Sequence, residues 1–142
     1  MAAVDVKGVN YTKNETFSTS SPIARGEKNA SVKVCIDTYT TDATEDAGST
    51  ITMGAFPDNA ILLGLTVAHT GLGTNVTLAA GDGTDADEYF AATAAATVGS
   101  IVADLDLNTA VVSGAIVLTT AGATLDTGNT ITMIAQYVEK LA

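Results

Sequence analysis

Apolar and polar residues alternate in short runs along most of the chain after residue 30. The first run covers residues 31–39, where Val32, Val34 and Ile36 fall on one face and Lys33, Cys35 and Asp37 fall on the other. Successive side chains of a β-strand point to opposite faces, so this period of two is typical of a strand. We therefore predict a half-buried strand here.

Seven further runs have the length and the alternation of strands. They cover residues 50–53, 60–67, 75–80, 100–104, 110–112, 115–120 and 130–138. Turn residues separate the runs, for example Ser113-Gly114 and Pro57 followed by Asp58; the latter is typical of a type I turn. About eight short strands with glycine-containing turns predict an all-β fold, a jelly-roll-like antiparallel β-sandwich.

One stretch has features of a helix. Residues 85–97 are rich in alanine, and Thr84 and Asp87 have the spacing of a capping box. We expect one short helix or a broad loop there, so the fold should contain at most one short helix.

A short sequence occurs twice in nearly the same form. Residues 48–53 read GSTITM, and residues 128–133 read GNTITM. The two could be related positions in two halves of the sandwich, or a chance similarity in a chain rich in threonine.

The first thirty residues differ from the rest. Residues 1–30 are polar, lack apolar periodicity and contain the run Ser18 to Pro22. Such a segment is typical of an extended arm, because it has too few apolar residues to build a core. We predict two parts, an extended N-terminal arm over 1–30 and a β-sandwich body over 31–142.

Charge is distributed unevenly between these parts. The net charge is −10, but residues 1–33 hold five basic and three acidic residues, a net +2, and the remainder holds one lysine and thirteen acidic residues, a net −12. A body this acidic repels nucleic acid and anionic lipid. The chain also has no run of about 18 apolar residues, the length needed to span a bilayer. We expect no nucleic acid and no membrane as partners.

The mildly basic segment has two interpretations. It is either an ordinary tail beside a solvated acidic surface, or a basic arm that binds an acidic partner. Under the second interpretation, the candidate partner-binding residues are Lys7, Lys13, Arg25 and Lys28.

The segment Gly81 to Ala86 satisfies the G-x-G-x-x-[GA] pattern of dinucleotide-binding loops. Asp82, Asp85, Asp87 and Glu88 crowd the position where a negatively charged pyrophosphate would bind, which argues against a nucleotide. These acids could bind calcium, but their spacing does not fit the calcium-loop pattern. A tight turn with carboxylates near a helix start explains them better.

Residues for catalysis and metal binding are few. The chain has one histidine, His69, and one cysteine, Cys35, and no G-x-S-x-G segment. A structural zinc site needs about four nitrogen or sulfur ligands, and these two residues are the only such candidates. We predict no catalytic, metal or cofactor residues and no enzyme activity, and we interpret Cys35 as a small buried apolar residue.

The order of strands and turns resembles the small decoration (cement) proteins of tailed-bacteriophage heads. The resemblance rests on segments across about half the chain. They are Ile51 to Gly54, Phe56-Pro57, Ala60-Ile61, Leu72 to Thr74, Val76 to Leu78, Gly81-Asp82, Asp85 to Phe90 and the closing run Ile131 to Val138.

The resemblance implies a jelly-roll-like β-sandwich that binds the outside of the major capsid protein lattice, commonly as a homotrimer, and reinforces it. It implies a non-enzymatic virion structural protein on the capsid exterior, produced in the host cytoplasm. The alternative is a receptor-binding or carbohydrate-binding β-domain, such as a fibre tip or adhesin. That alternative needs exposed aromatic residues, and Tyr89-Phe90 is the only adjacent aromatic pair.

Overall fold

A computed structural model describes residues 3–7, 32–42, 44–106 and 110–139, and this part of the chain contains strands and loops without a helix. Nothing in these residues is a helix long and apolar enough to cross a membrane. The strands are β1 (Asp5–Lys7), β2 (Lys33–Thr40), β3 (Thr50–His69), β4 (Thr77–Gly81), β5 (Phe90–Ala94), β6 (Gly99–Val102), β7 (Val111–Ala121) and β8 (Thr130–Val138).

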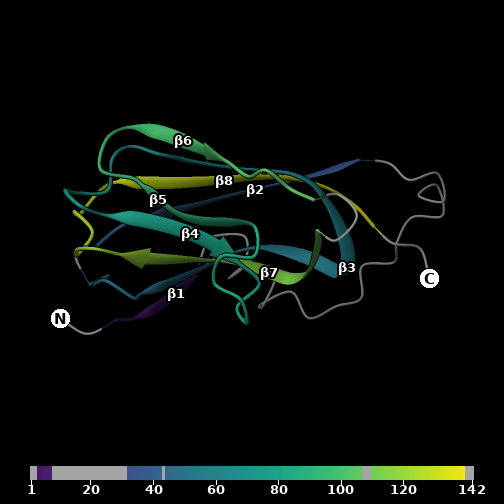
Figure 1. Ribbon diagram of the computed structural model, residues 1–142, viewed down its shortest axis with the longest axis horizontal. Helices are drawn as coiled ribbons and strands as arrows, with labels where there is room; N and C mark the ends of the chain where they lie inside the picture. Colours follow the sequence, from purple (N-terminus) through teal and green to yellow (C-terminus); the bar gives the residue numbers. More distant parts are fainter. Residues whose placement is uncertain (1–2, 8–31, 43, 107–109, 140–142) are drawn as a thin grey trace.

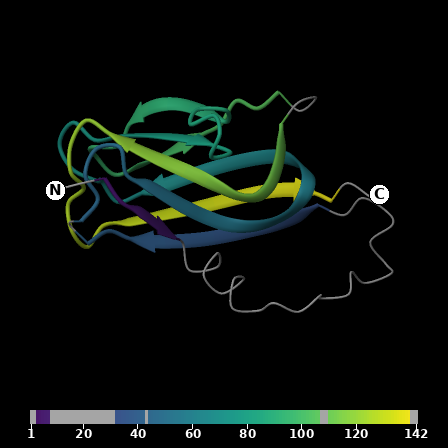
Figure 2. The ribbon, with the colours of Figure 1, turned by 90° about the horizontal axis from the view of Figure 1, so that it is seen from below.

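The strands form two layers that share β3. Hydrogen-bonded neighbours run in the order β2-β8-β3-β7-β4-β5, and both β1 and β6 also pair with β3. The second half of β3 lies between β8 and β6, and its first half lies between β1 and β7. Figures 1 and 2 show β3 bending at the end of the molecule opposite the marked N-terminus. The predicted all-β, sandwich-like fold is confirmed.

The bend of β3 lies where the sequence predicts a turn between two strands. Pro57 and Asp58 are inside one continuous strand, whose pairing with β7 shifts register between Met53 and Phe56 and again before Ala60. Such β-bulges change the direction of a strand without ending it. The predicted strands at residues 50–53 and 60–67 are therefore one strand of 20 residues.

Strand β7 also joins two predicted strands. Gly114, which has a positive φ of 75°, pairs with Phe56 inside the irregular part of β3. The expected turn at Ser113-Gly114 is thus a feature of β7, which follows the bend of its neighbour.

The inward face of β2 is its polar face. Asp37 is only 2% exposed, and its Oδ2 accepts a hydrogen bond of 2.8 Å from the backbone N–H of Gly54 at the start of the bend. Its Oδ1 accepts a second bond of 2.9 Å from the N–H of Thr38. Cys35, two residues earlier, is half-buried; burial raises the pKa of its thiol, and the nearby backbone of Ala55 opposes that rise. Strand β2 therefore fixes the bend at Gly54 through Asp37.

The core lies between the two layers. Val76, Leu78 and Ala80 are buried, as their alternation predicts. On β3 the alternation changes phase, because a register shift between Leu62 and Gly64 places Leu62 inward together with Leu65. The largest fully buried apolar side chains are Ile51, Met53, Leu62, Leu65, Leu72, Leu78, Ile116, Leu118, Ile131, Met133 and Val67.

The alanine-rich stretch at residues 85–97 forms a loop and strand β5. Before it, Oδ1 of Asp82 accepts hydrogen bonds of 2.8 Å from the N–H groups of both Thr84 and Asp85. A Cβ added at Gly81 would lie 1.7 Å from the carbonyl oxygen of Asp85, so the turn requires glycine there. Side-chain acceptors that bind nearby N–H groups compete with helix formation, which explains the loop.

The two similar six-residue segments occupy similar places. Each starts with a glycine of positive φ, Gly48 at 89° or Gly128 at 83°, and leads into a long strand that begins with the same alternation of buried and half-buried residues. The preceding loops lie side by side, since the N–H of Leu125 donates a 2.9 Å hydrogen bond to the carbonyl of Glu45.

Strand β1 is short and parallel to the first half of β3, with Asp5 opposite Thr50 and Lys7 opposite Thr52. The N–H of Val4 donates to Oγ of Ser49 at 2.9 Å, and the N–H of Thr50 donates to the carbonyl of Val4 at 2.9 Å. Of the predicted arm, residues 3–7 thus pair with the body, and the other residues of 1–30 lie outside the described part of the chain.

We predict that replacing Asp37 by alanine destabilises the protein by about 2–3 kcal/mol, because the buried N–H of Gly54 loses a charged acceptor. Urea denaturation measures the change. The control is Asp58→Ala, which removes an exposed carboxylate from the same bend and should stay within about 0.5 kcal/mol of the parent. Equal losses for the two variants would contradict this role of Asp37.

Candidate interaction surface

The outward side of four strands forms one continuous face. Strand pairing places β2, β8, the second half of β3 and β6 next to one another. One row across them holds Ile36, Ile134, Thr66 and Val102, because each is in register with the next. The next row, by the same register, is Thr38, Thr132, Ala68 and Ser100. We call this surface the β2-β6 face.

This face is apolar and uncharged. Val34 is 54% exposed, Ile36 53% and Val102 70%. Valine, isoleucine, threonine, serine, alanine, glycine and glutamine supply all its outward positions on the four strands. Of the seven large exposed apolar residues in the described ranges, six lie on or beside it: Val32, Val34, Ile36, Val98, Val102 and Ile134. Such gathering marks an interaction surface, whereas single exposed apolar residues are ordinary.

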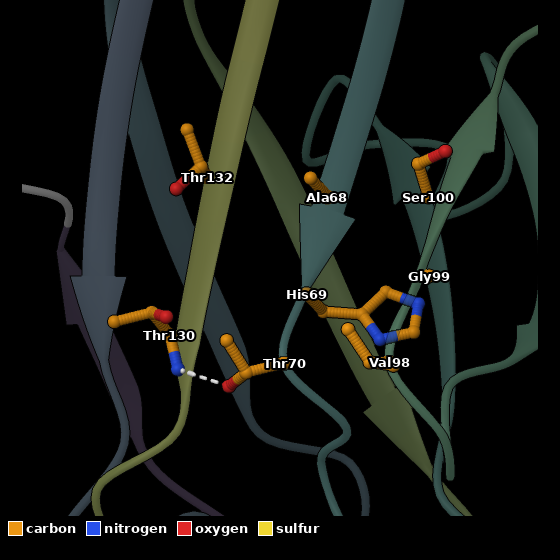
Figure 3. A pocket seen from close by; sticks show the side chains of 8 residues that line it. All are labelled: Ala68, His69, Thr70, Val98, Gly99, Ser100, Thr130 and Thr132. Carbon is orange, nitrogen blue, oxygen red and sulfur yellow. Dashed lines mark hydrogen bonds between the residues drawn. The ribbon is translucent and has the colours of Figure 1, made fainter.

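A hollow of about 420 Å³ opens in the face near the end of β3. Figure 3 shows that its lining residues come from β8, the end of β3, and the start of β6 with the residue before it. Ala68 and Gly99 leave space, and threonine and serine hydroxyls line the rim. The lining residues are Ala68, His69, Thr70, Val98, Gly99, Ser100, Thr130 and Thr132.

His69 borders the hollow from the inward side of β3. It is 5% exposed, and its Nδ1 is buried without a hydrogen-bond partner in the described part of the chain. Burial lowers the pKa of His69, so the imidazole is neutral at pH 7. Cys35 is elsewhere, since it pairs with Ala135, which pairs with Leu65, four residues before His69 on β3. The structure does not bring the histidine and the cysteine together.

The acidic residues singled out in the sequence are engaged in loop structure. The N–H groups of Asp85 and Thr84 lower the pKa of the Asp82 carboxyl, and the neighbouring Asp85 raises the pKa of Asp87. In the described residues, no three histidine, cysteine, aspartate or glutamate side chains are grouped as metal ligands would be.

A second set of acids lies in the loop after β2. Glu45 is fully buried and accepts hydrogen bonds from the hydroxyl of Tyr39 and from the N–H of Asp42. Burial, and next the contact with Glu45, raise the pKa of Tyr39 far above its usual range. This carboxylate closes the loop, so its role is structural.

The aromatic residues do not form an exposed platform in the described ranges. Tyr89 and Phe90 are buried, and burial raises the pKa of Tyr89 to about 12. Phe56 is also buried and meets the half-buried Tyr137 edge-on, with ring centroids 5.3 Å apart. Tyr89 and Phe90, the adjacent pair that a carbohydrate-binding domain would use for stacking, are thus part of the core.

Of the four basic residues predicted to bind a partner, only Lys7 belongs to the described part of the chain. Lys7 is the last residue of β1, and Lys13, Arg25 and Lys28 lie outside the described residues. The sequence alone did not predict an interaction site at the β2-β6 face. The alternation in β2 could have indicated it, because a buried aspartate in this strand places the valines and the isoleucine on the opposite, outward side.

Comparisons with known proteins give two solved structures of the same fold. A chain of the "Capsid of Ralstonia phage GP4" superposes with a TM-score of 0.66 and 22% identity over 81% of this chain and 89% of that one. A chain of the "Cyanophage Pam1 capsid asymmetric unit" gives a TM-score of 0.58 and 23% identity over 78% and 86%. Neither the comparison with known protein families nor that with curated proteins gives a match.

We predict that the melting temperature falls as the pH is lowered from 7 to 5.5. The unfolded chain binds a proton at an imidazole of ordinary pKa, about 6.5, before the folded chain does, so acid favours unfolding in this range. Because the chain has one histidine, His69→Gln should remove most of this slope. Equal slopes for the two proteins, measured by calorimetry, would contradict the assignment.

Proposed function

We propose that this chain is a non-enzymatic structural protein of a phage virion, which binds the outside of the capsid lattice as a trimer and stabilises it. The observation that carries the proposal is the fold that it shares, over most of both chains, with a chain of the Ralstonia phage GP4 capsid. The Cyanophage Pam1 capsid chain supports it independently. The resemblance of the strand and turn order to decoration proteins points the same way.

The surface of the described residues also supports a binding role. The protein presents an uncharged apolar face, and a hollow in it is lined by hydroxyl and small side chains with a neutral histidine at the border. Such a surface suits contact with another protein, where apolar packing at the centre of an interface contributes most of the binding energy.

The uneven charge supports a division of labour. We propose that the net +2 of residues 1–33 binds the major capsid protein through Lys7, Lys13, Arg25 and Lys28, while the acidic body stays in solvent. Ordering a flexible segment costs about 2–5 kcal/mol, so a single contact would be weak. Three linked segments in a trimer would raise the overall affinity by orders of magnitude through avidity.

The alternative, a receptor-binding or carbohydrate-binding domain, has less support. It needs exposed aromatic rings, and Tyr39, Phe56, Tyr89, Phe90 and Tyr137 are all buried or half-buried. A glycan array would test it directly.

We predict that the purified protein sediments with phage heads that lack it and raises the temperature at which they release DNA. A fourfold variant, Lys7→Gln, Lys13→Gln, Arg25→Gln and Lys28→Gln, should bind at least about tenfold more weakly, because each lost charge removes an electrostatic contact. Co-sedimentation at two salt concentrations measures both effects.

The matched control is Lys140→Gln, which changes the basic residue outside the N-terminal segment and should leave binding unchanged. No binding by the parent protein would overturn the proposed function. Unchanged binding by the fourfold variant would overturn only the role given to the four basic residues.

A further inference from the structure

We propose that the β2-β6 face is the surface through which copies of this chain bind one another. The inference rests on the trimer in the proposed function and adds the residues that form the contact. It assigns self-association to the apolar side chains of β2, β8 and β6 and does not involve the basic residues proposed to bind the capsid.

Charge favours a second copy as the occupant. Each chain carries a net charge of −10, so two copies repel each other wherever acidic surfaces meet. The four strands of this face present no charged side chain outward. An exposed carboxylate, that of Asp104, lies two residues after Val102 at the edge of the face. Other exposed acids, such as those between Asp82 and Glu88, need not face one another across the contact.

The extent of the face suits such a contact. Four strands about 4.8 Å apart, each up to about eight residues long at about 3.3 Å per residue, cover roughly 500 Å². In a closed trimer the three faces surround the threefold axis, and each face is divided between two neighbours. Each pair of copies then shares about 500 Å², and the three copies together bury about 1,500 Å², within the range of specific interfaces.

The relief of the face provides complementary shapes. Ile36 and Val102 project from the row that also contains Ile134, and the hollow around Ala68 and Gly99 lies beside that row. Rows of β-branched side chains pack against another sheet at about 10 Å separation, as in the interior of a sandwich. A second copy carries the same β-branched rows on an exposed sheet face, so it can supply the opposing sheet.

Sedimentation velocity of the full chain without capsids tests the proposal. The parent protein should be oligomeric at about 50 µM, a concentration at which association with a micromolar dissociation constant is detected. The double variant Val34→Asp and Val102→Asp should raise the dissociation constant at least about 100-fold, since each copy then buries unpaired carboxylates. The control Val111→Asp changes an exposed valine of β7 outside the face and should leave the oligomer intact.

A monomeric parent protein, or a double variant as oligomeric as the parent, would overturn the inference. If the double variant does not fold, photo-crosslinking of the parent protein from position 102, with position 111 as the control, replaces it. Crosslinked oligomers from position 102 and not from 111 support the proposal, and the reverse result overturns it.

Capsid binding is measured separately. A monomer that binds heads refutes this inference alone, and an oligomer that fails to bind heads refutes the proposed function alone.

Discussion

Strand β3 belongs to both layers of the sandwich, and the carboxylate of Asp37 fixes the bend where it passes from one to the other. A buried carboxylate is costly unless it accepts hydrogen bonds, and here two backbone N–H groups supply them. Because Asp37 must point inward, Val34 and Ile36 must point outward, since alternate residues of a strand face opposite sides. The polar interaction inside thus produces the apolar surface outside.

The two faces of β2 therefore carry out different tasks. The inward residue Asp37 holds the bend at Gly54, and the half-buried Cys35 lies near the backbone of Ala55. The outward residues continue a row that reaches β6 on the far side of the layer. A substitution on the inward face would change the stability of the fold. A substitution on the outward face would change the surface that is available to a partner.

Alternation predicted the class of fold because it depends only on neighbouring residues. The inward set on β4, with Val76 before it, followed directly from that pattern. Local reasoning was wrong at Pro57-Asp58 and Ser113-Gly114, where turn residues serve as irregularities in long paired strands, since pairing between distant segments decides whether a chain turns or bends. Local reasoning also could not locate the β2-β6 face. Hydropathy alone would place the valines of β2 inside, because the burial of Asp37 depends on a hydrogen bond from Gly54, seventeen residues away.

The ends of the basic N-terminal region are held unequally. Residue 7 ends β1, which pairs with β3 over three residues, and residue 33 begins β2, which pairs with β8 over eight. Tension on the chain between these strands would load both layers of the sandwich. Hydrogen bonds along paired strands share such a load, so the three-residue attachment would yield before the eight-residue one. The body would then stay connected through β2 after β1 had detached.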